Sequence, residues 1–246
     1  MTHSDEPILQ VKNLKTYFKT DQGLAKAVDD VSFSLSAGTT LSVVGESGCG
    51  KSVTALSVMG LVPQPPGVKA GGQILFEGRD LRAMPERQLR AIRGNDISMI
   101  FQEPMSCLDP TATIGEQLEE AVDDDQLSGY FWKKRQQRKI AATNLLHKVG
   151  IKHHEICTKS YPHQLTEALC QRVMIAMALA GRPMLLIADE PTAAMESSNQ
   201  GKIFRLLASL NQLKNMSIAV DFIFSISNDF EFSDFTGFRI HNFNGF

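Results

Sequence analysis

Several patterns are missing from this sequence, and each absence argues against a class of protein. No apolar run approaches the ~20 residues that a membrane-spanning helix needs. The formal net charge is only −2, so no overall basic field favours nucleic acid as a partner. Residues 1–10 are polar and acidic, without the pattern of a secretory signal peptide. Cysteine is sparse and scattered, with no C-x-x-C pair, which predicts reduced thiols in a cytosolic protein rather than disulfides or a zinc site. The four cysteines are Cys49, Cys107, Cys157 and Cys170.

What remains is the composition of a folded α/β protein. The 246 residues suit one large domain or a domain with a subdomain, and a hydrophobic content of 43% can form a core. Residues 8–44 alternate as half-buried strands do, residues 105–165 are helical in character, and a strand–helix pattern returns after 165. Helices are expected there over 171–180 and 202–213. The chain changes from Phe222 onward, where eight of the fourteen phenylalanines lie, Phe222 included. No strand pattern is visible there, and we expect a poorly determined tail over 231–246.

The strongest motif is a phosphate-binding P-loop at residues 45–52. It follows an apolar run and precedes a helical pattern, which is the context that this motif requires. Its glycines allow the backbone to wrap closely around a phosphate chain, and the helix end favours the anion. We expect Lys51 to reach the β- and γ-phosphates and Ser52 to hold Mg²⁺. The loop consists of Gly45, Glu46, Ser47, Gly48, Cys49, Gly50, Lys51 and Ser52.

The second half of a nucleotide site follows two predicted strands. Residues 185–188 form a continuous apolar run, typical of a parallel strand buried on both faces, and Asp189 and Glu190 come directly after it. We expect Asp189 to hold Mg²⁺ and Glu190 to act as the general base for an attacking water. Gln102 follows another predicted strand and is a candidate for contact with both the metal and that water.

Two aromatic patterns leave alternatives open. Tyr17 and Phe18 are candidates for stacking on a purine ring, or ordinary residues of a sheet. The second pattern is an aromatic run followed by basic residues, which suits a helix at a lipid surface. Such a run is more often a solvated helix face with an aromatic anchor, and we favour that interpretation. The run consists of Tyr130, Phe131, Trp132, Lys133, Lys134, Arg135, Arg138 and Lys139.

Together these motifs resemble the ATP-binding subunits of ABC transporters. The resemblance rests on the P-loop, on residues 102–104, on the strand leading to Glu190, and on residues 165–171 in the position of the family's signature sequence. It covers about residues 8–230. Segments 45–52, 100–105 and 185–192 are similar to the peptide and nickel importer branch. Within that branch, segments 106–110, 147–152 and 203–207 are similar to the Sap-type D subunits.

The resemblance implies a fold, cofactors and partners. The fold class is α/β, with a P-loop NTPase core (about 1–102 and 171–230), an antiparallel β-subdomain, and a helical subdomain at about 103–170. ATP and Mg²⁺ are the implied cofactors, and Phe18 matches the adenine-stacking aromatic. The implied partners are a second ATP-binding subunit, membrane-spanning permease subunits and, indirectly, a substrate-binding protein, with no nucleic acid. The implied location is peripheral, on the cytoplasmic face of the bacterial inner membrane.

The chain departs from the family pattern at three places. The signature segment, which reads Leu-Ser-Gly-Gly in the family, is Leu165, Thr166, Glu167 and Ala168 here, and it is expected to contact the ATP bound by a partner subunit. The D-loop, which ends in aspartate in most of the family, reads Ala194-Met195-Glu196 here. Asn228 stands where the family has its switch histidine, which contacts the γ-phosphate. The Sap-type branch itself departs at the first two of these places.

These departures leave two functions to weigh. The leading one is an ATP-hydrolysing subunit that powers a peptide-type transporter. The alternative is a nucleotide-binding regulatory subunit with weak or no hydrolysis. A soluble ABC ATPase of translation or DNA repair fits less well, because such proteins usually carry two ATPase domains or a long coiled coil.

Overall fold

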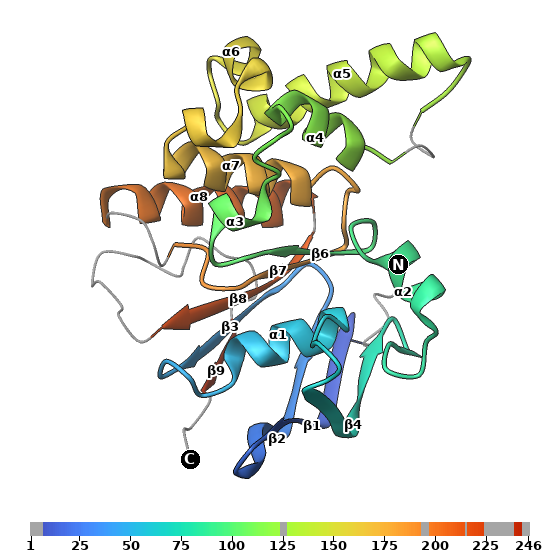
Figure 1. The fold of residues 1–246 in the computed structure, drawn as a ribbon, viewed down its shortest axis with the longest axis vertical. Helices are drawn as coiled ribbons and strands as arrows, with labels where there is room; N and C mark the ends of the chain where they lie inside the picture. The colour runs from blue at the N-terminus through green and yellow to red at the C-terminus, as the bar shows by residue number, and fades with distance from the viewer. Residues whose placement is uncertain (1–6, 124–126, 193–196, 215, 224–238, 243–246) are drawn as a thin grey trace.

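Two β-sheets and a group of helices make up the fold in the computed structural model (Figure 1). The structure describes residues 7–123, 127–192, 197–214, 216–223 and 239–242. Helix α1 lies between the two sheets, and most of the helices gather on the opposite side of the larger sheet (Figure 1).

The smaller sheet is antiparallel, with its strands in the order β2-β1-β4-β5. These strands are β1 (Leu9–Thr20), β2 (Gly23–Leu35), β4 (Gly67–Phe76) and β5 (Arg79–Asp80). β1 lies inside the sheet, because Leu9 pairs with both Leu35 of β2 and Phe76 of β4. Leu9, Val11 and Leu14 are buried, whereas polar residues between them reach the surface, as expected for a strand with one face on the core.

The larger sheet is parallel and carries the strand order β6-β7-β8-β3-β9. These strands are β3 (Thr40–Gly45), β6 (Ile97–Ile100), β7 (Leu185–Ala188), β8 (Ser217–Ile223) and β9 (Arg239–Asn242). Because parallel strands share one direction, the residues that follow β3, β6 and β7 meet at one edge of the sheet. That edge holds the P-loop, Gln102 and the pair Asp189 and Glu190.

The helices divide between the two faces of the parallel sheet. α1 (Lys51–Met59) packs with the antiparallel sheet, as does the short α2 (Glu86–Ile92). We call α3 to α7 the helical lobe (Figure 1). It comprises α3 (Pro104–Cys107), α4 (Ile114–Ala121), α5 (Phe131–Lys148), α6 (His154–Lys159), the 3-10 turn Pro162–Gln164 and α7 (Glu167–Ala178). The last helix is α8 (Ser197–Lys214), and within the described residues no helix is long and apolar enough to cross a membrane.

The parallel sheet separates two apolar cores. Leu185 and Ile187 of β7 pack with α1 and the antiparallel sheet, whereas Leu186 and Ala188 pack with the helical lobe and α8. All four side chains are buried, which confirms the prediction of a strand covered on both faces. Asp189 and Glu190 therefore leave β7 between two packed layers, and their backbone is held from both sides.

The starts of two helices and the presence of one strand differ from the sequence prediction. α7 was expected from about residue 171 but begins at Glu167, because Thr166 caps it. α8 was expected from 202 and begins at Ser197. No strand was expected after residue 230, yet β9 pairs with β3. That expectation is wrong over Arg239–Asn242, where backbone pairing at the sheet edge needs no strong apolar alternation.

Candidate nucleotide-binding site

The P-loop joins the end of β3 to the start of α1. Gly45 is the buried last residue of β3, and Lys51 is the first residue of α1. Gly50, between them, has a φ of 98°, which disfavours any residue with a side chain. A Cβ at this position would also overlap the carbonyl oxygen of Ala27 in β2. Gly50 is thus required by its backbone conformation and by the close packing of the antiparallel sheet against the loop.

The amino-terminal end of α1 is open to an anion. Gly50 provides no side-chain cap, and the first turn of α1 contains no acidic residue. The first amide groups of a helix have no carbonyl partner within it, and the positive end of the helix dipole lies there. Glu46, Ser47 and Gly48 are exposed, so a phosphate chain can reach these groups from solvent.

Lys51 places a buried positive charge at the same end of the helix. Its Nζ donates to the carbonyl oxygens of Gly45 at 3.0 Å and Glu46 at 2.9 Å. It also lies 3.8 Å from Sγ of Cys49. The side chain is only 5% exposed. The loop backbone therefore holds the ammonium group beside the open amide groups of α1.

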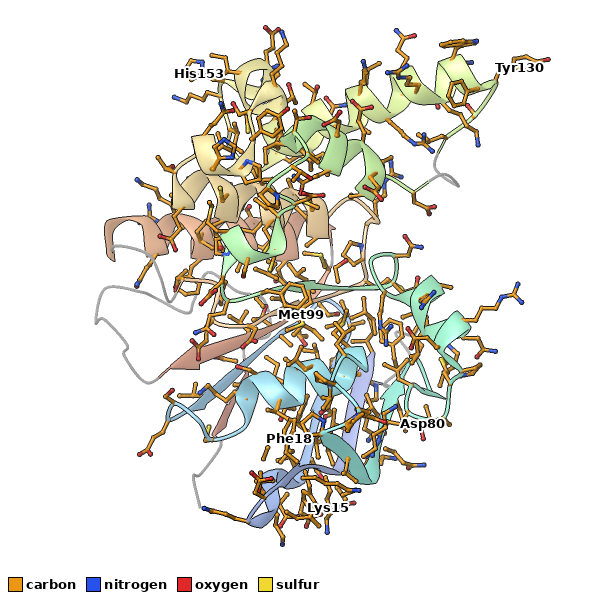
Figure 2. All side chains as sticks on the ribbon, in the orientation of Figure 1. Lys15, Phe18, Asp80, Met99, Tyr130 and His153 are labelled. Carbon is orange, nitrogen blue, oxygen red and sulfur yellow. The ribbon has the colours of Figure 1, made fainter. Side chains whose placement is uncertain are left out.

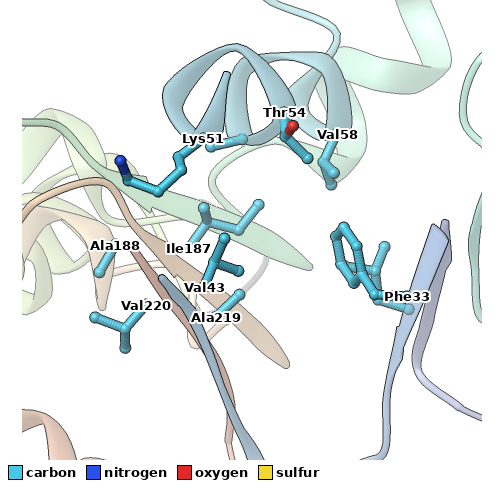
Figure 3. Close-up of a pocket in the computed structure, with 11 residues that line it drawn as sticks. Phe33, Val43, Lys51, Thr54, Val58, Ile187, Ala188, Ala219 and Val220 are labelled. Atoms are coloured by element: carbon cyan, nitrogen blue, oxygen red, sulfur yellow. The ribbon is translucent and has the colours of Figure 1, made fainter. Parts of the chain in front are cut away.

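A small cavity lies behind Lys51, in the core between the two sheets. Its volume is about 30 Å³, room for about one water molecule. Its lining is mostly apolar and comes from both sheets and α1, and Figure 3 shows Phe33, Val43, Val58, Ile187 and Ala219 around it. This space is a packing gap beneath the loop and is too small and too apolar for a nucleotide.

Ser52 and Asp189 meet although 137 residues separate them in the chain. Ser52 Oγ donates to Oδ1 of Asp189 at 2.8 Å. Asp189 is buried, and its backbone N–H donates to the carbonyl oxygen of Ile100 at 3.0 Å, which extends the pairing of β6 with β7. A hydroxyl and a carboxylate side by side are oxygen ligands of the kind that Mg²⁺ prefers.

Gln102 and Glu190 form the second contact across this edge. Nε2 of Gln102 donates to Oε2 of Glu190 at 2.6 Å. Gln102 is the second residue after the end of β6, Glu190 is the second residue after the end of β7, and these strands are neighbours. Glu190 has a φ of 43°, in the left-handed region that residues with side chains rarely adopt. Such backbone strain is common where a side chain is held for chemistry.

Burial changes the acidity of Glu190. Removal from water raises the pKa of this carboxyl, the neighbouring negative charge of Asp189 raises it further, and Lys51 acts in the opposite direction. A carboxylate with a raised pKa is a stronger base, and its pKa lies closer to neutral working conditions. The environment of Glu190 therefore suits the predicted role of general base.

Phe18 lies in the antiparallel sheet beside the strand that touches the P-loop. It pairs with Ala25 of β2 and Gly67 of β4. Ala25 is two residues before Ala27, whose carbonyl oxygen packs against Gly50. The other candidate, Tyr17, donates its hydroxyl to Oδ1 of Asp29 at 2.6 Å. Phe18 stays the predicted purine-stacking residue.

The signature segment lies in the helical lobe, at the start of α7. The hydroxyl of Thr166 caps this helix and accepts from the N–H of Leu169 at 3.4 Å. Glu167 is the exposed first residue of α7, where the helix dipole stabilises a negative charge. Leu165 and Ala168 are half-buried. No hydrogen bond joins these four residues to the P-loop in the part of the chain that the structure describes.

Two of the predicted features lie outside the described residues. Asn228, the expected γ-phosphate contact, is one of them. The other is the segment 194–196, where the D-loop was expected. Their roles stay predictions.

Gln171, the last residue of the segment 165–171, is a positioning candidate for which the motifs predicted no role of its own. It is 2% exposed, and its Nε2 donates to the carbonyl oxygen of Pro191 at 2.8 Å. Pro191 directly follows Glu190, so Gln171 links the helical lobe to the backbone that carries the predicted base. A polar residue inside the apolar helix α7 was the available sequence signal, but its partner is visible only in three dimensions.

The site and fold define a nucleotide-binding cassette, and comparison with known proteins gives the family. The ABC transporter family model matches residues 28–193, more than half of the chain. The chain belongs to the ABC transporter family.

Particular relatives extend this result. The chain is 46% identical over 212 residues to the peptide transport system ATP-binding protein SapD of Salmonella typhimurium, covering 86% of this chain and 64% of that protein. It is 44% identical over 212 residues to the oligopeptide transport ATP-binding protein OppD of Bacillus subtilis, covering 86% and 58%. The chain thus spans about three-fifths of the length of these curated relatives.

Solved structures show the same architecture. The dimeric structure of MJ0796, described as a bacterial ABC transporter cassette, matches with a TM-score of 0.75 and 26% identity over 87% of each chain. A post-hydrolysis dimer of MJ0796 bound to ADP and phosphate matches with a TM-score of 0.74. These likenesses confirm the α/β fold class and the resemblance inferred from the motifs.

Proposed function

We propose that this chain binds and hydrolyses ATP and that it powers a peptide-type ABC transporter. The observation that carries the proposal is the pair of contacts at one sheet edge, Ser52 with Asp189 and Gln102 with Glu190. The similarity to SapD and OppD, which are named for peptide and oligopeptide transport, supports the substrate class.

The residues present fit MgATP. The open amide groups of α1 and the ammonium of Lys51 bind the phosphate chain. Ser52, Asp189 and the amide oxygen of Gln102 offer hard oxygen ligands, which suit Mg²⁺. When bound by these residues, Mg²⁺ would neutralise charge on the transferred phosphoryl group.

Glu190 accepts a proton from the attacking water. Its raised pKa makes it the better base, and the hydrogen bond from Gln102 holds its carboxylate at the end of β7. The packed layers on both sides of β7 fix the backbone that carries it. Gln102 therefore orients the base and borders the proposed metal position, two roles that one side chain can serve at this edge.

A second ATP-binding subunit completes the site in this proposal. Thr166 and Glu167 of the signature segment are exposed at the start of α7, and the segment makes only local hydrogen bonds within the described residues, so it can face another cassette. The dimeric MJ0796 structures support this arrangement by analogy. Thr166 and nearby backbone amides contact the partner's γ-phosphate, and the Glu167 carboxylate points away from it, since like charges ~4 Å apart repel by about 4 kcal/mol at an effective dielectric near 20.

The remaining parts of the proposal concern the partners and location of the chain, the adenine contact and the division into subdomains. Membrane-spanning permease subunits and, indirectly, a substrate-binding protein are the proposed partners, and the chain sits peripherally on the cytoplasmic face of the inner membrane. Phe18 stacks on the adenine. The division into a core and a helical subdomain over about 103–170 belongs to the same proposal.

The test is a phosphate-release assay on the purified chain with MgATP, combined with copurification from native membranes. We expect steady ATP hydrolysis and recovery of membrane subunits. Binding of MgATP without hydrolysis, in the presence of the recovered partners, would instead favour a regulatory subunit. Absence of MgATP binding would overturn the proposal as a whole.

A further inference from the structure

The amino-terminal end of α5 exposes three consecutive aromatic side chains. Tyr130 is 89% exposed, Phe131 67% and Trp132 75%. We call these three residues the aromatic tip. It projects from the helical lobe, where Figure 2 labels Tyr130 at the far end of α5. The sequence favoured a solvated helix face with an aromatic anchor. The start of α5 is indeed exposed to solvent, but none of the three rings is buried in the core, so the anchor is the part of that interpretation that is wrong.

The exposed rings form one apolar patch. Phe131 and Trp132 lie edge to face, with ring centroids 5.5 Å apart. Ile140, two turns further along α5, is also 54% exposed. Soluble proteins rarely group large apolar side chains on the surface without a partner, and such groups mark interaction sites.

The charges around the tip indicate which partner suits it. Lys133 and Lys134 directly follow the rings, Lys139 lies on the exposed side of α5, and the first turn of α5 contains no acidic residue. Arg135 and Arg138 instead border an open hollow between α4 and α5. The hollow is also lined by Phe131 of the tip and by Glu119, Glu120 and Asp123, so opposite charges lie together beside that ring. Asp124 and Asp125 complete this acidic stretch and lie outside the described residues.

We propose that the aromatic tip and the lysines beside it dock on the surface of an anionic phospholipid bilayer. Tryptophan and tyrosine rings prefer the level of the lipid headgroups, where their apolar faces leave water and their polar atoms stay hydrated. Lysine side chains lie along the apolar boundary and keep their ammonium groups among the anionic headgroups. This contact is distinct from the nucleotide site and does not depend on hydrolysis.

The chain carries its own reporter for this contact. Trp132 is its only tryptophan, so the emission spectrum reports on the tip alone. The purified chain is titrated with vesicles of phosphatidylglycerol and phosphatidylcholine, and with vesicles of phosphatidylcholine alone. We expect a blue shift of the Trp132 emission and sedimentation with the mixed vesicles, both weakened at high salt because the attraction is partly electrostatic.

Variants separate the aromatic and the charge contributions. The double change Lys133→Glu with Lys134→Glu is expected to weaken vesicle binding about tenfold or more, since each lysine near an anionic surface contributes to the attraction. Phe131→Ser is expected to reduce the blue shift. The matched controls are Lys12→Glu with Lys19→Glu, and Leu24→Ala, which change exposed residues on the antiparallel sheet and should leave binding unchanged.

The outcomes distinguish a lipid from a protein partner. ATP binding by each variant verifies that it is folded. No spectral shift with any vesicle overturns the proposal, as does vesicle binding that survives the tip changes. A shift that appears only when membrane subunits are added assigns the tip to a protein contact and likewise overturns it. The nucleotide site can pass or fail its own tests in either case.

Discussion

The carboxyl edge of the parallel sheet and the start of α7 both carry motif residues, but they are built in different ways. At the sheet edge, Ser52 meets Asp189 and Gln102 meets Glu190, across 137 and 88 residues of chain. At the start of α7, the hydroxyl of Thr166 bonds only three residues ahead, to Leu169. The first region is assembled by the fold of one chain, whereas the second is an exposed helix end. The difference shows that the tertiary structure of one chain holds together the sheet-edge half of the proposed site. The signature half, in our proposal, is completed by a partner subunit.

The largest effect expected on ATP binding tests the P-loop at the sheet edge. Lys51→Ala removes the buried ammonium group from the P-loop, and we expect ATP affinity to fall about a hundredfold, since hydrogen bonds to a charged group contribute roughly 1.5–3 kcal/mol each. A nucleotide titration measures this. Lys12→Ala, an exposed lysine of β1, is the control. Equal affinity in both variants would remove the P-loop from the proposed site.

The next largest effect is expected from the hydrogen bond between Gln171 and Pro191, which links the two regions. Gln171→Leu leaves the carbonyl oxygen of Pro191 without its donor in a buried place, and we expect a loss of about 2 kcal/mol in unfolding free energy. Urea unfolding measures it, with Gln88→Leu on the exposed side of α2 as the control. If Gln171 positions Glu190, the variant also lowers kcat more than it raises KM. A stability loss with unchanged kcat would mean that the link is only structural.

The acidity of Glu190 predicts a smaller, pH-dependent effect. Because its pKa is raised in the folded protein, the charged form costs stability above that pKa, and the cost disappears below the ordinary carboxyl value of 4.5. Glu190→Gln should therefore be more stable than the parent near neutral pH, and this advantage should shrink as the pH falls toward 4.5. Unfolding curves at several pH values measure it. An advantage of constant size, or one shared by the exposed control Glu120→Gln, would contradict the burial argument.

The smallest effect is expected at the signature segment. Glu167→Gln keeps the shape of the side chain but removes its charge from the start of α7, which should cost about 0.5 kcal/mol of stability at low salt and less at high salt. In the assembled dimer the same change should raise ATP turnover modestly, because a negative charge leaves the neighbourhood of the partner's phosphate. Thermal unfolding and phosphate release measure the two effects. Lower turnover would show that the carboxylate contributes to the partner's site.

The residues that meet at the sheet edge could be picked out from the sequence, because each of them belongs to a local pattern; their roles toward a nucleotide stay predictions. The glycines and Lys51 of the P-loop, and Asp189 and Glu190 after an apolar strand, are recognisable without knowing what they touch. The same holds for the burial of β7, since a continuous apolar run is typical of a strand covered on both faces.

Other features depend on contacts between distant segments. The packing of Gly50 against Ala27, the bond from Gln171 to Pro191, and the left-handed backbone of Glu190 involve partners that no local pattern names. β9 was missed because its pairing with β3 is made by the backbone, which leaves little trace in side-chain periodicity. The exposure of the aromatic tip likewise could not be predicted from the sequence, because it depends on which distant segments pack against α5.

The most direct test of the central claim compares the parent chain with Glu190→Gln in ATP binding and in single-turnover hydrolysis. The amide keeps the shape of the side chain but cannot accept the proton of the attacking water, so the account predicts unchanged ATP affinity and turnover slower by a factor on the order of 10²–10⁴. ATP-bound dimers should then accumulate in the variant. Hydrolysis by Glu190→Gln at the rate of the parent would contradict the assignment of Glu190 as the base, and with it the account of the sheet edge as the catalytic site.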